Sequence, residues 1–197
     1  AKQHTAGCKT DTERAVAMLL AMPKFMRHPT MPPMGPSVGF GRGLDDESLL
    51  KSGCGFCNEQ ARVFIRLCQV MGIPARMVHL FGQGHTVAEF YADGHWALAD
   101  STNIFVVPGK DGLLLSAAQC HDHGEGQRMY AEAKQRRISE MLKMSWQDLG
   151  FGTEEKAQKW TKANNEPFAG KLATQELAFA VMNYPLIQID INHTVRD

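Results

Sequence analysis

The sequence predicts an α+β fold in which one helix packs on an antiparallel sheet. Two observations lead to this prediction. Apolar residues recur at helical spacing from Asn58 to Met71. Three strand-like runs follow directly, at residues 75–81, 85–91 and 95–100, separated by the turn sequences GQG and ADG. Strands joined by such short turns pair antiparallel, so we expect a helix followed by a three-stranded meander.

The composition is that of one ordinary globular domain. The chain has 197 residues, and 44% of them are hydrophobic, which is enough to bury a sizeable core. The 21 Lys and Arg residues balance the 21 Asp and Glu residues, so the charge does not indicate nucleic acid or an anionic membrane as a partner. No run approaches the roughly 18 to 20 consecutive apolar residues of a membrane span. We therefore expect a soluble single domain over residues 1–197.

The first quarter of the chain predicts a helix and an irregular segment. Residues 10–22 begin with a capping-box pattern, Thr10 followed by Glu13, and Pro23 ends the apolar stripe. Residues 23–43 contain five prolines and four glycines, too many for regular elements. We expect this N-terminal part, residues 1–49, to pack against a core formed by residues 50–105.

The second half of the chain predicts a helical extension over residues 106–197. Residues 129–146 have apolar side chains on one helical face, and residues 153–165 form a polar helix with Trp160 as its apolar anchor. The sequence NYPLIQIDI at 183–191 alternates as a strand does.

The compartment stays open at this stage. The sequence begins at Ala1 without a Met, and a signal peptide removed before Ala1 would make the protein secreted or periplasmic. Five cysteines are too few and too scattered for a disulfide framework, and their odd number leaves at least one without an intrachain partner. They are Cys8, Cys54, Cys57, Cys68 and Cys120.

The stretch GCGFC at residues 53–57 allows three kinds of cysteine chemistry. In a redox dithiol, a C-x-x-C pair begins a helix whose dipole lowers the pKa of the thiol. In such proteins the pair directly follows a buried apolar strand of a βαβ unit. The residues before Cys54 read GLDDESLLKSG, which is acidic and polar, so redox catalysis is disfavoured.

A zinc site is the second kind. Tetrahedral zinc binds sulfur and nitrogen ligands, and Cys54 and Cys57 could share it with two ligands from Cys120-His121-Asp122-His123. That cluster lies more than 60 residues after Cys57 and lacks the usual ligand spacing. We therefore expect no metal, with a zinc-bound scaffold as an alternative.

A thiol nucleophile explains more of the sequence. A cysteine becomes a useful nucleophile when a histidine takes its proton and a third group orients that histidine. Cys57 lies in the first turn of the expected helix, where the partial positive charge of the N-terminus favours a thiolate. His85 begins the second expected strand and Asp100 ends the third, so antiparallel pairing can bring them together. Cys57, His85 and Asp100 are therefore the candidate catalytic residues.

Four linked motifs within about 50 residues resemble the transglutaminase-like superfamily. They read GFCNEQA (55–61), GIPARMV (72–78), GHTVAEFY (84–91) and HWALADST (95–102). The resemblance implies a papain-like α+β core in which a catalytic helix packs on the antiparallel sheet, with extra helices at both ends of the chain. It also implies Cys57 as nucleophile, His85 as base and Asp100 as the residue that orients His85, without a metal or an organic cofactor.

The sequence departs from the family pattern at two points. The family usually has a Trp two residues after the histidine, where this chain has Val87. The family also takes one oxyanion-hole donor from the backbone N–H of the cysteine and another from an upstream side chain, often Trp or Gln. No Trp precedes Cys57 and the only upstream glutamine is Gln3, so the second donor is unassigned.

Residues around the motif have expected roles outside catalysis. We expect Glu89 to support the strands, Trp96 to pack in the core and Arg76 either to form a structural ion pair or to line the cleft. Cys54 is either inert or forms a disulfide with Cys57 that switches the site off.

The predicted function is thiol-dependent acyl chemistry on an amide bond, as in a peptidase or amidase, or acyl transfer. The expected partner is a peptide, a protein or another amide-containing substrate. We favour hydrolysis, because transfer needs a site that admits an acceptor amine ahead of water. The alternative is a transglutaminase-like module that binds a peptide or glycan without catalysis. The sequence does not define the substrate or the oligomeric state.

Overall fold

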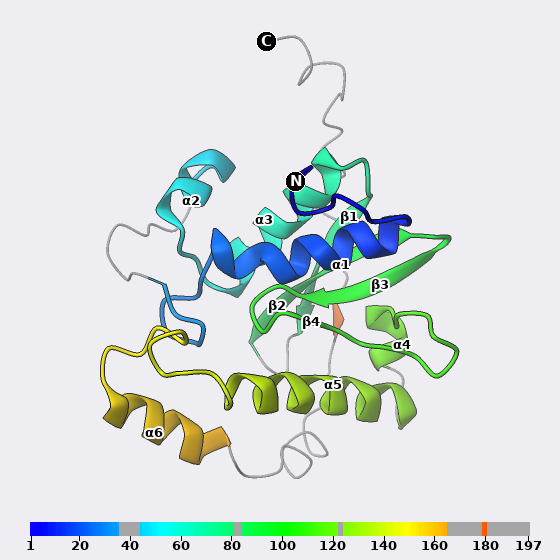
Figure 1. The fold of residues 1–197 in the computed structure, drawn as a ribbon. Helices are drawn as coiled ribbons and strands as arrows, with labels where there is room; N and C mark the ends of the chain where they lie inside the picture. Colours follow the sequence, from blue (N-terminus) through cyan, green and yellow to red (C-terminus); the bar gives the residue numbers. More distant parts are fainter. Residues whose placement is uncertain (36–43, 81–83, 122–123, 165–178, 181–197) are drawn as a thin grey trace.

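The computed structural model describes residues 1–35, 44–80, 84–121, 124–164 and 179–180 (Figure 1). The helices are α1 (Asp11–Ala21), α2 (Asp46–Ser52), α3 (Cys57–Val70), α4 (Ala117–His121), α5 (Glu125–Met141) and α6 (Glu154–Asn164), with a 3-10 turn at Met22–Lys24. The strands are β1 (Ala75–Leu80), β2 (His85–Ala92), β3 (His95–Asp100), β4 (Phe105–Val106) and β5 (Phe179–Ala180).

The strands form one sheet in the order β4-β3-β2-β1-β5, and every neighbouring pair is antiparallel. The predicted helix and three-stranded meander are confirmed. Ala75 pairs with Phe90 at one end of the β1–β2 ladder, and Leu80 pairs with His85 at the other. The β2–β3 turn has positive φ at Asp93 (52°) and at Gly94 (90°), which is the geometry of a type I′ hairpin.

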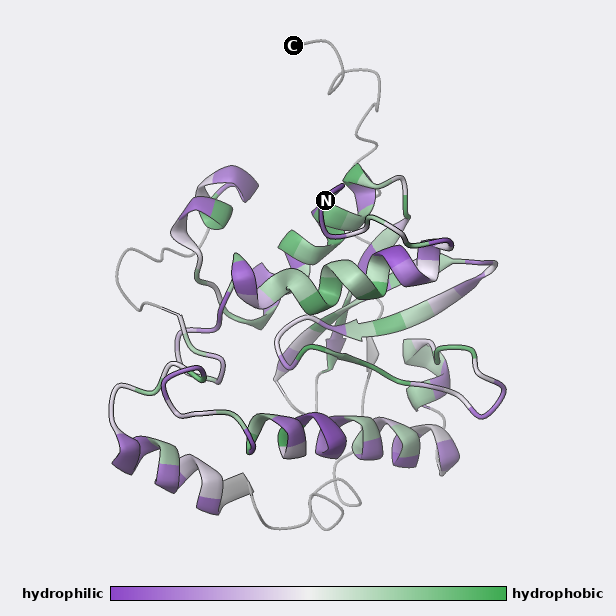
Figure 2. Ribbon diagram, viewed as in Figure 1, coloured by the Kyte–Doolittle hydropathy of each residue, from purple (hydrophilic) through white to green (hydrophobic). Residues whose placement is uncertain are grey.

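The sheet is the middle of three layers (Figure 1). On one face, small and apolar strand residues such as Ala88 and Phe90 pack against α1 and α3. On the other face, Val87 and Leu98 pack with α4 and α5 residues, including Tyr130. In Figure 2 the hydrophobic colour gathers on α1, α3 and the strands, whereas α5 and α6 are largely hydrophilic. The fold is therefore α+β and papain-like, with the predicted helix on the antiparallel sheet.

The helix α3 has the sequence features of a central, half-buried helix. The carboxylate of Glu59 accepts a hydrogen bond of 2.9 Å from the backbone N–H of Phe56, which caps the first turn. Phe64 meets Phe90 of the sheet edge to face, with ring centroids 6.3 Å apart. Gly72 follows the helix with φ of 79°, a conformation that favours glycine and ends the helical run.

The N-terminal part packs against this core as predicted. Thr10 caps α1 by accepting a hydrogen bond of 3.1 Å from the N–H of Glu13. The Glu13 carboxylate accepts from the N–H of Lys9 at 2.6 Å, one residue earlier than in an ideal capping box. Met22, directly after α1, and Met26 of the irregular segment are buried in the core with residues of α1 and α3.

The C-terminal helices differ from the prediction in their ends. The helix expected at 129–146 is α5, which starts and ends four or five residues earlier, at Glu125 and Met141. The helix expected at 153–165 is α6, and its Trp160 packs on Phe151 with ring centroids 5.8 Å apart. The strand expected at 183–191 lies outside the described residues.

The segment 117–121, which contains Cys120 and His121 of the zinc alternative, forms the short helix α4. Ala117 and Cys120 of this helix are buried with Val87 and Leu98 of the sheet, and this burial stabilises so short a helix. No helix in the described ranges is both long and apolar enough to cross a bilayer.

A buried ion pair joins β1 and β2. Arg76 and Glu89 face each other in the ladder, and Arg76 Nε lies 2.7 Å from Glu89 Oε2. Glu89 is fully buried, and its other oxygen accepts from the N–H of Ala117 at 2.5 Å. The expected structural role of Glu89 is confirmed, and of the two roles considered for Arg76 the structure has the ion pair. Trp96 is only half-buried, because it stacks on the Arg76 guanidinium at 4.0 Å instead of entering the core.

Breaking this pair from the arginine side should destabilise the fold strongly. Arg76→Met leaves a buried carboxylate without a countercharge, and we expect the free energy of unfolding in urea to fall by about 3–5 kcal/mol. Adding Glu89→Gln should recover part of the loss, because a neutral amide needs no countercharge and can still accept from Ala117. A single variant within about 1 kcal/mol of wild type would contradict this account.

Candidate active site

Cys57 is the first residue of α3, as the sequence predicts. Two glycines shape the approach to it. Gly53 ends α2 in the left-handed conformation, with φ of 64°. A Cβ at Gly55 would lie 2.7 Å from the Cβ of Glu59 and 3.0 Å from the methyl group of Met26, so only glycine fits at this crossing.

The irregular N-terminal segment lies alongside this approach. The N–H of Arg27 donates to the carbonyl of Gly53 at 3.0 Å, and the N–H of Gly55 donates to the carbonyl of Arg27 at 3.0 Å. These bonds form a short parallel bridge between Arg27 and Cys54. A segment about thirty residues earlier in the sequence therefore borders the turn that presents Cys57.

Strand pairing brings His85 and Asp100 to the same end of the sheet. Ala88 pairs with Ala99, so the first residue of β2 and the last residue of β3 lie beyond this pair in the same direction. Their side chains meet with His85 Nε2 at 2.9 Å from Asp100 Oδ2. The N-terminus of α3 also lies at this end, since α3 connects through a short turn to β1, whose last residue pairs with His85.

Asp100 is fully buried and its carboxylate is fully engaged. Oδ1 accepts from the N–H of Thr102 at 3.0 Å and from the N–H of Asn103 at 2.9 Å. Oδ2 accepts from Nδ2 of Asn103 at 2.8 Å and faces His85. Burial alone would raise the pKa of Asp100, but the charge and hydrogen bond of His85 and the N–H of Asn103 lower it to about 2. Asp100 is therefore ionised at neutral pH.

His85 is held in its protonated form by this carboxylate. Burial lowers the pKa of His85, whereas the charge of Asp100, its hydrogen bond and the neighbouring Cys57 raise it, with a net rise to about 9. Because Nε2 faces Asp100, Nδ1 is the ring nitrogen left to face the Cys57 thiol. The carboxylate thus sets both the charge and the orientation of the ring.

The Cys57 thiol is shifted toward the thiolate. Burial raises the pKa of Cys57, but the hydrogen bond and charge of His85 and the backbone and hydroxyl groups of Thr86 outweigh burial, and the pKa is lowered. The pKa shifts of Cys57, His85 and Asp100 thus all favour a thiolate–imidazolium pair next to an ionised carboxylate. The three predicted site residues therefore lie together, and their catalytic role stays a prediction.

The other half of the C-x-x-C pair has a different environment. Cys54 is a free, fully buried thiol, and burial raises its pKa. Burial also raises the pKa of Cys120, to about 12. Cys54 and Cys57 are both free thiols in this structure, and the role of Cys54 stays a prediction.

The zinc alternative has no support among the described residues. No group of three or more His, Cys, Asp or Glu side chains gathers there in a way that could hold a metal ion. Cys120 points into the core beside Tyr130. Asp122 and His123 lie outside the described residues.

Val87, which replaces the family's aromatic residue, is fully buried on the α5 face of the sheet. Sequence reasoning missed Thr86 and Asn103, which contact Cys57 and Asp100. Asn103 had a signal, since the sequence D-S-T-N places a short polar side chain three residues after the aspartate, where a turn can return it.

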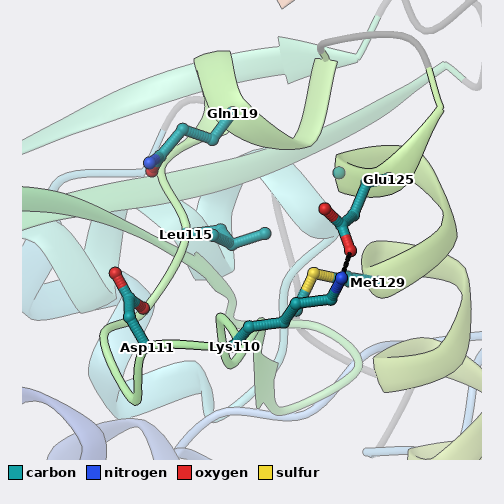
Figure 3. Close-up of a pocket in the computed structure, with 7 residues that line it drawn as sticks. Lys110, Asp111, Leu115, Gln119, Glu125 and Met129 are labelled. Atoms are coloured by element: carbon teal, nitrogen blue, oxygen red, sulfur yellow. Dashed lines mark ion pairs between the residues drawn. The ribbon is translucent and has the colours of Figure 1, made fainter.

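A pocket of about 360 Å³ lies apart from Cys57, His85 and Asp100 (Figure 3). Lys110 and Glu125 form an ion pair across it, and Leu115 and Met129 supply its apolar wall. Both charged side chains are largely exposed, so solvent screens the pair. None of the candidate catalytic residues lines this pocket.

A helix N-terminus that presents cysteine to a histidine and an aspartate on an antiparallel sheet defines a papain-like, thiol-dependent class of fold. A family model places the chain within that class. The model of the transglutaminase-like superfamily matches residues 1–101, just over half of the chain, and the chain belongs to this superfamily. No curated protein sequence matches it.

Two solved structures are similar over part of their length. A candidate cysteine protease from Cytophaga hutchinsonii shares 19% identity with a TM-score of 0.43, over 57% of this chain and 38% of its own. A structure described as a TGase shares 16% identity with a TM-score of 0.38, over 48% of this chain and 27% of its own. The chain thus spans well under half the length of either solved chain.

The raised pKa of His85 predicts a pH-dependent stability. The imidazolium stabilises the fold fully below the unfolded pKa near 6.5, and this contribution is lost as the pH rises toward about 9. The Cys57 thiolate acts with the opposite sign, since a lowered thiol pKa adds stability as the pH rises. We therefore choose the Cys57→Ala background. Its free energy of unfolding should still fall above pH 6.5, because Asp100 still raises the pKa of His85, but over a narrower pH range than the wild-type pKa implies, since the effect of Cys57 is gone. The slope should not exceed about 1.4 kcal/mol for each pH unit.

The matched control is Cys57→Ala with Asp100→Asn, which removes the carboxylate that raises the pKa of His85. We expect a much flatter profile for this double variant, with urea unfolding followed by circular dichroism. Equal slopes in both proteins would mean that Asp100 does not hold the proton on His85.

Proposed function

We propose that the protein performs thiol-dependent acyl chemistry on an amide bond, with Cys57 as nucleophile, His85 as general base and acid, and Asp100 as the orienting carboxylate. The observation that supports this most is the chain of contacts at one end of strands β2 and β3. The Cys57 thiol hydrogen-bonds to His85, and His85 Nε2 lies 2.9 Å from the buried Asp100 carboxylate.

The proposed reaction begins with the proton of the Cys57 thiol on His85. The thiolate attacks the carbonyl carbon, a carbon–sulfur bond forms, and the π electrons of the carbonyl move to its oxygen. The tetrahedral intermediate collapses, the carbon–nitrogen bond breaks, and His85 gives its proton to the leaving amine. A water molecule then attacks the thioester while His85 takes its proton. The carbon–sulfur bond breaks, the carboxylic acid leaves, and the thiolate takes the proton back from His85.

The position of Cys57 supports the first step in two ways. The partial positive charge at the N-terminus of α3 favours the thiolate. The backbone N–H of Cys57 is the first of the helix, and such N–H groups have no carbonyl partner within their own helix. This N–H can therefore donate to the oxyanion that forms on the carbonyl.

We favour hydrolysis of a peptide or another amide over transfer to an amine. Hydrolysis needs only water at the thioester, whereas transfer needs a site that holds an acceptor amine. A peptide- or glycan-binding module is the second candidate, and the aliphatic Val87 in place of the family's aromatic residue favours it.

An activated ester tests the chemistry without knowledge of the substrate. With p-nitrophenyl acetate, we expect selective acetylation of Cys57 well below the pH of about 8.5 at which an ordinary thiol ionises. His85→Ala should abolish this preference, because the thiol then loses its base. The measurement is mass-spectrometric assignment of the acetylated cysteine, together with release of p-nitrophenolate.

Cys54→Ala is the matched control, since it removes the neighbouring thiol and should leave the acetylation of Cys57 unchanged. Added glycine methyl ester separates the two reactions, because a hydrolase should release acetate at the same rate with or without the amine. If Cys57 proves no more reactive than Cys8, the chemistry fails and the binding module becomes the better explanation.

A further inference from the structure

The N-terminal segment brings a second histidine to the site. The backbone N–H and carbonyl of Arg27 hydrogen-bond to Gly53 and Gly55 in the turn before Cys57. His28 is the next residue in the sequence. The His28 ring meets Phe56, the residue before Cys57, edge to face with centroids 5.3 Å apart. The side chain is buried, with 7% of its surface exposed. His28 also lies close enough to His85 and Asp100 for their charges to act on it.

The hydrogen bonds of His28 define its tautomer. Nδ1 accepts from the backbone N–H of Thr30 at 3.1 Å and from that of Met31 at 3.0 Å. A backbone N–H can only donate, so Nδ1 must present its lone pair, and the proton of a neutral imidazole then lies on Nε2. Burial and the positive charge of His85 lower the pKa of His28 to about 4, against a smaller opposite effect of Asp100.

We propose that His28 is a further catalytic residue, whose Nε2–H donates the second hydrogen bond to the oxyanion beside the backbone N–H of Cys57. This inference rests on the proposed function and supplies the donor that the sequence left unassigned. Nε2 is the donor because the described part of the chain supplies hydrogen bonds to Nδ1 only. His28 gives up no proton in the reaction and acts only by hydrogen bonding.

A neutral histidine suits this position for an electrostatic reason. A second imidazolium next to His85 would repel it and weaken the thiolate–imidazolium pair. A neutral Nε2–H stabilises the oxyanion without that repulsion. The ring is also held before substrate arrives, by Thr30 and Met31 at Nδ1 and by its edge-to-face contact with Phe56, which is the preorganisation that oxyanion donors need.

Two amide variants separate the donor role from a structural role. In His28→Asn the amide oxygen takes the place of Nδ1 and can still accept from Thr30 and Met31, but the donor is lost. In His28→Gln the amide nitrogen reaches the place of Nε2, so the donor is kept and the acceptor is lost. A structural role is thus retained by Asn, and an oxyanion donor is retained by Gln.

The readout is the ratio of two rates at Cys57 in the full chain. Acetylation by p-nitrophenyl acetate passes through an oxyanion, whereas alkylation by iodoacetamide does not and reports only on the thiolate. For His28→Asn we expect acetylation to fall by about 10²–10³-fold while alkylation keeps its wild-type rate and pH profile. For His28→Gln we expect acetylation within about tenfold of wild type, at an unchanged alkylation rate.

Three results would overturn the inference. The first is a His28→Asn variant that acetylates as fast as wild type, and the second is a His28→Gln variant that loses acetylation and alkylation in parallel, as a purely structural role of Nδ1 predicts. A wild-type Cys57 that iodoacetamide does not label selectively overturns the proposed function and this inference together. A normal alkylation profile with unaltered acetylation in His28→Asn overturns this inference alone.

A measurement on the wild type covers variants that fail to fold. Acetaldehyde adds to a reactive thiol as a hemithioacetal, whose oxygen occupies the oxyanion position. In protein labelled with ¹⁵N at histidine, the Nε2–H proton of His28 should shift downfield on adduct formation. An unshifted resonance in the presence of the adduct would contradict the donor role.

Discussion

The buried carboxylate of Asp100 is the group on which the site depends. A carboxylate without exposed surface is costly unless its charge is compensated and its oxygens accept hydrogen bonds. Asp100 satisfies both conditions at once, through His85 on one side and the 102–103 turn on the other. Any register shift between β2 and β3 would break the first condition, and any change in the turn would break the second. The chemistry proposed at Cys57 therefore depends on the exact pairing of two strands that do not contain it.

The sheet carries two such groups, and they have different uses. Glu89 is as buried as Asp100, but its partner is an arginine, which stays charged at every accessible pH. That pair can only stabilise the strands. Asp100 faces a histidine, which can give up its proton and take it back, whereas an arginine cannot. The choice of partner, and not burial, decides which carboxylate belongs to a reactive site.

Sequence reasoning succeeded where a residue's place follows from local structure. Cys57, His85 and Asp100 all lie at the ends of regular elements. The helix and strand patterns were therefore enough to predict that the three residues lie at the same end of the sheet. It could not find His28, because that residue lies in a segment without periodicity and reaches the site through backbone bonds between Arg27 and the turn at 53–55. The helix α4 was missed for a related reason, since five residues are too few to show a helical pattern, and its burial depends on packing with residues such as Tyr130.

The two histidines of this site show how one fold can hold the same side chain in opposite states. His85 faces a carboxylate and keeps its proton up to a pKa of about 9. His28 is buried beside the positive charge of His85, which together lower its pKa to about 4, and its Nδ1 accepts from two backbone N–H groups. Environments that push two titratable groups apart in this way assign different roles to them. Between these two values the site holds one cation and one neutral donor, which is the arrangement that a thiolate and a developing oxyanion require.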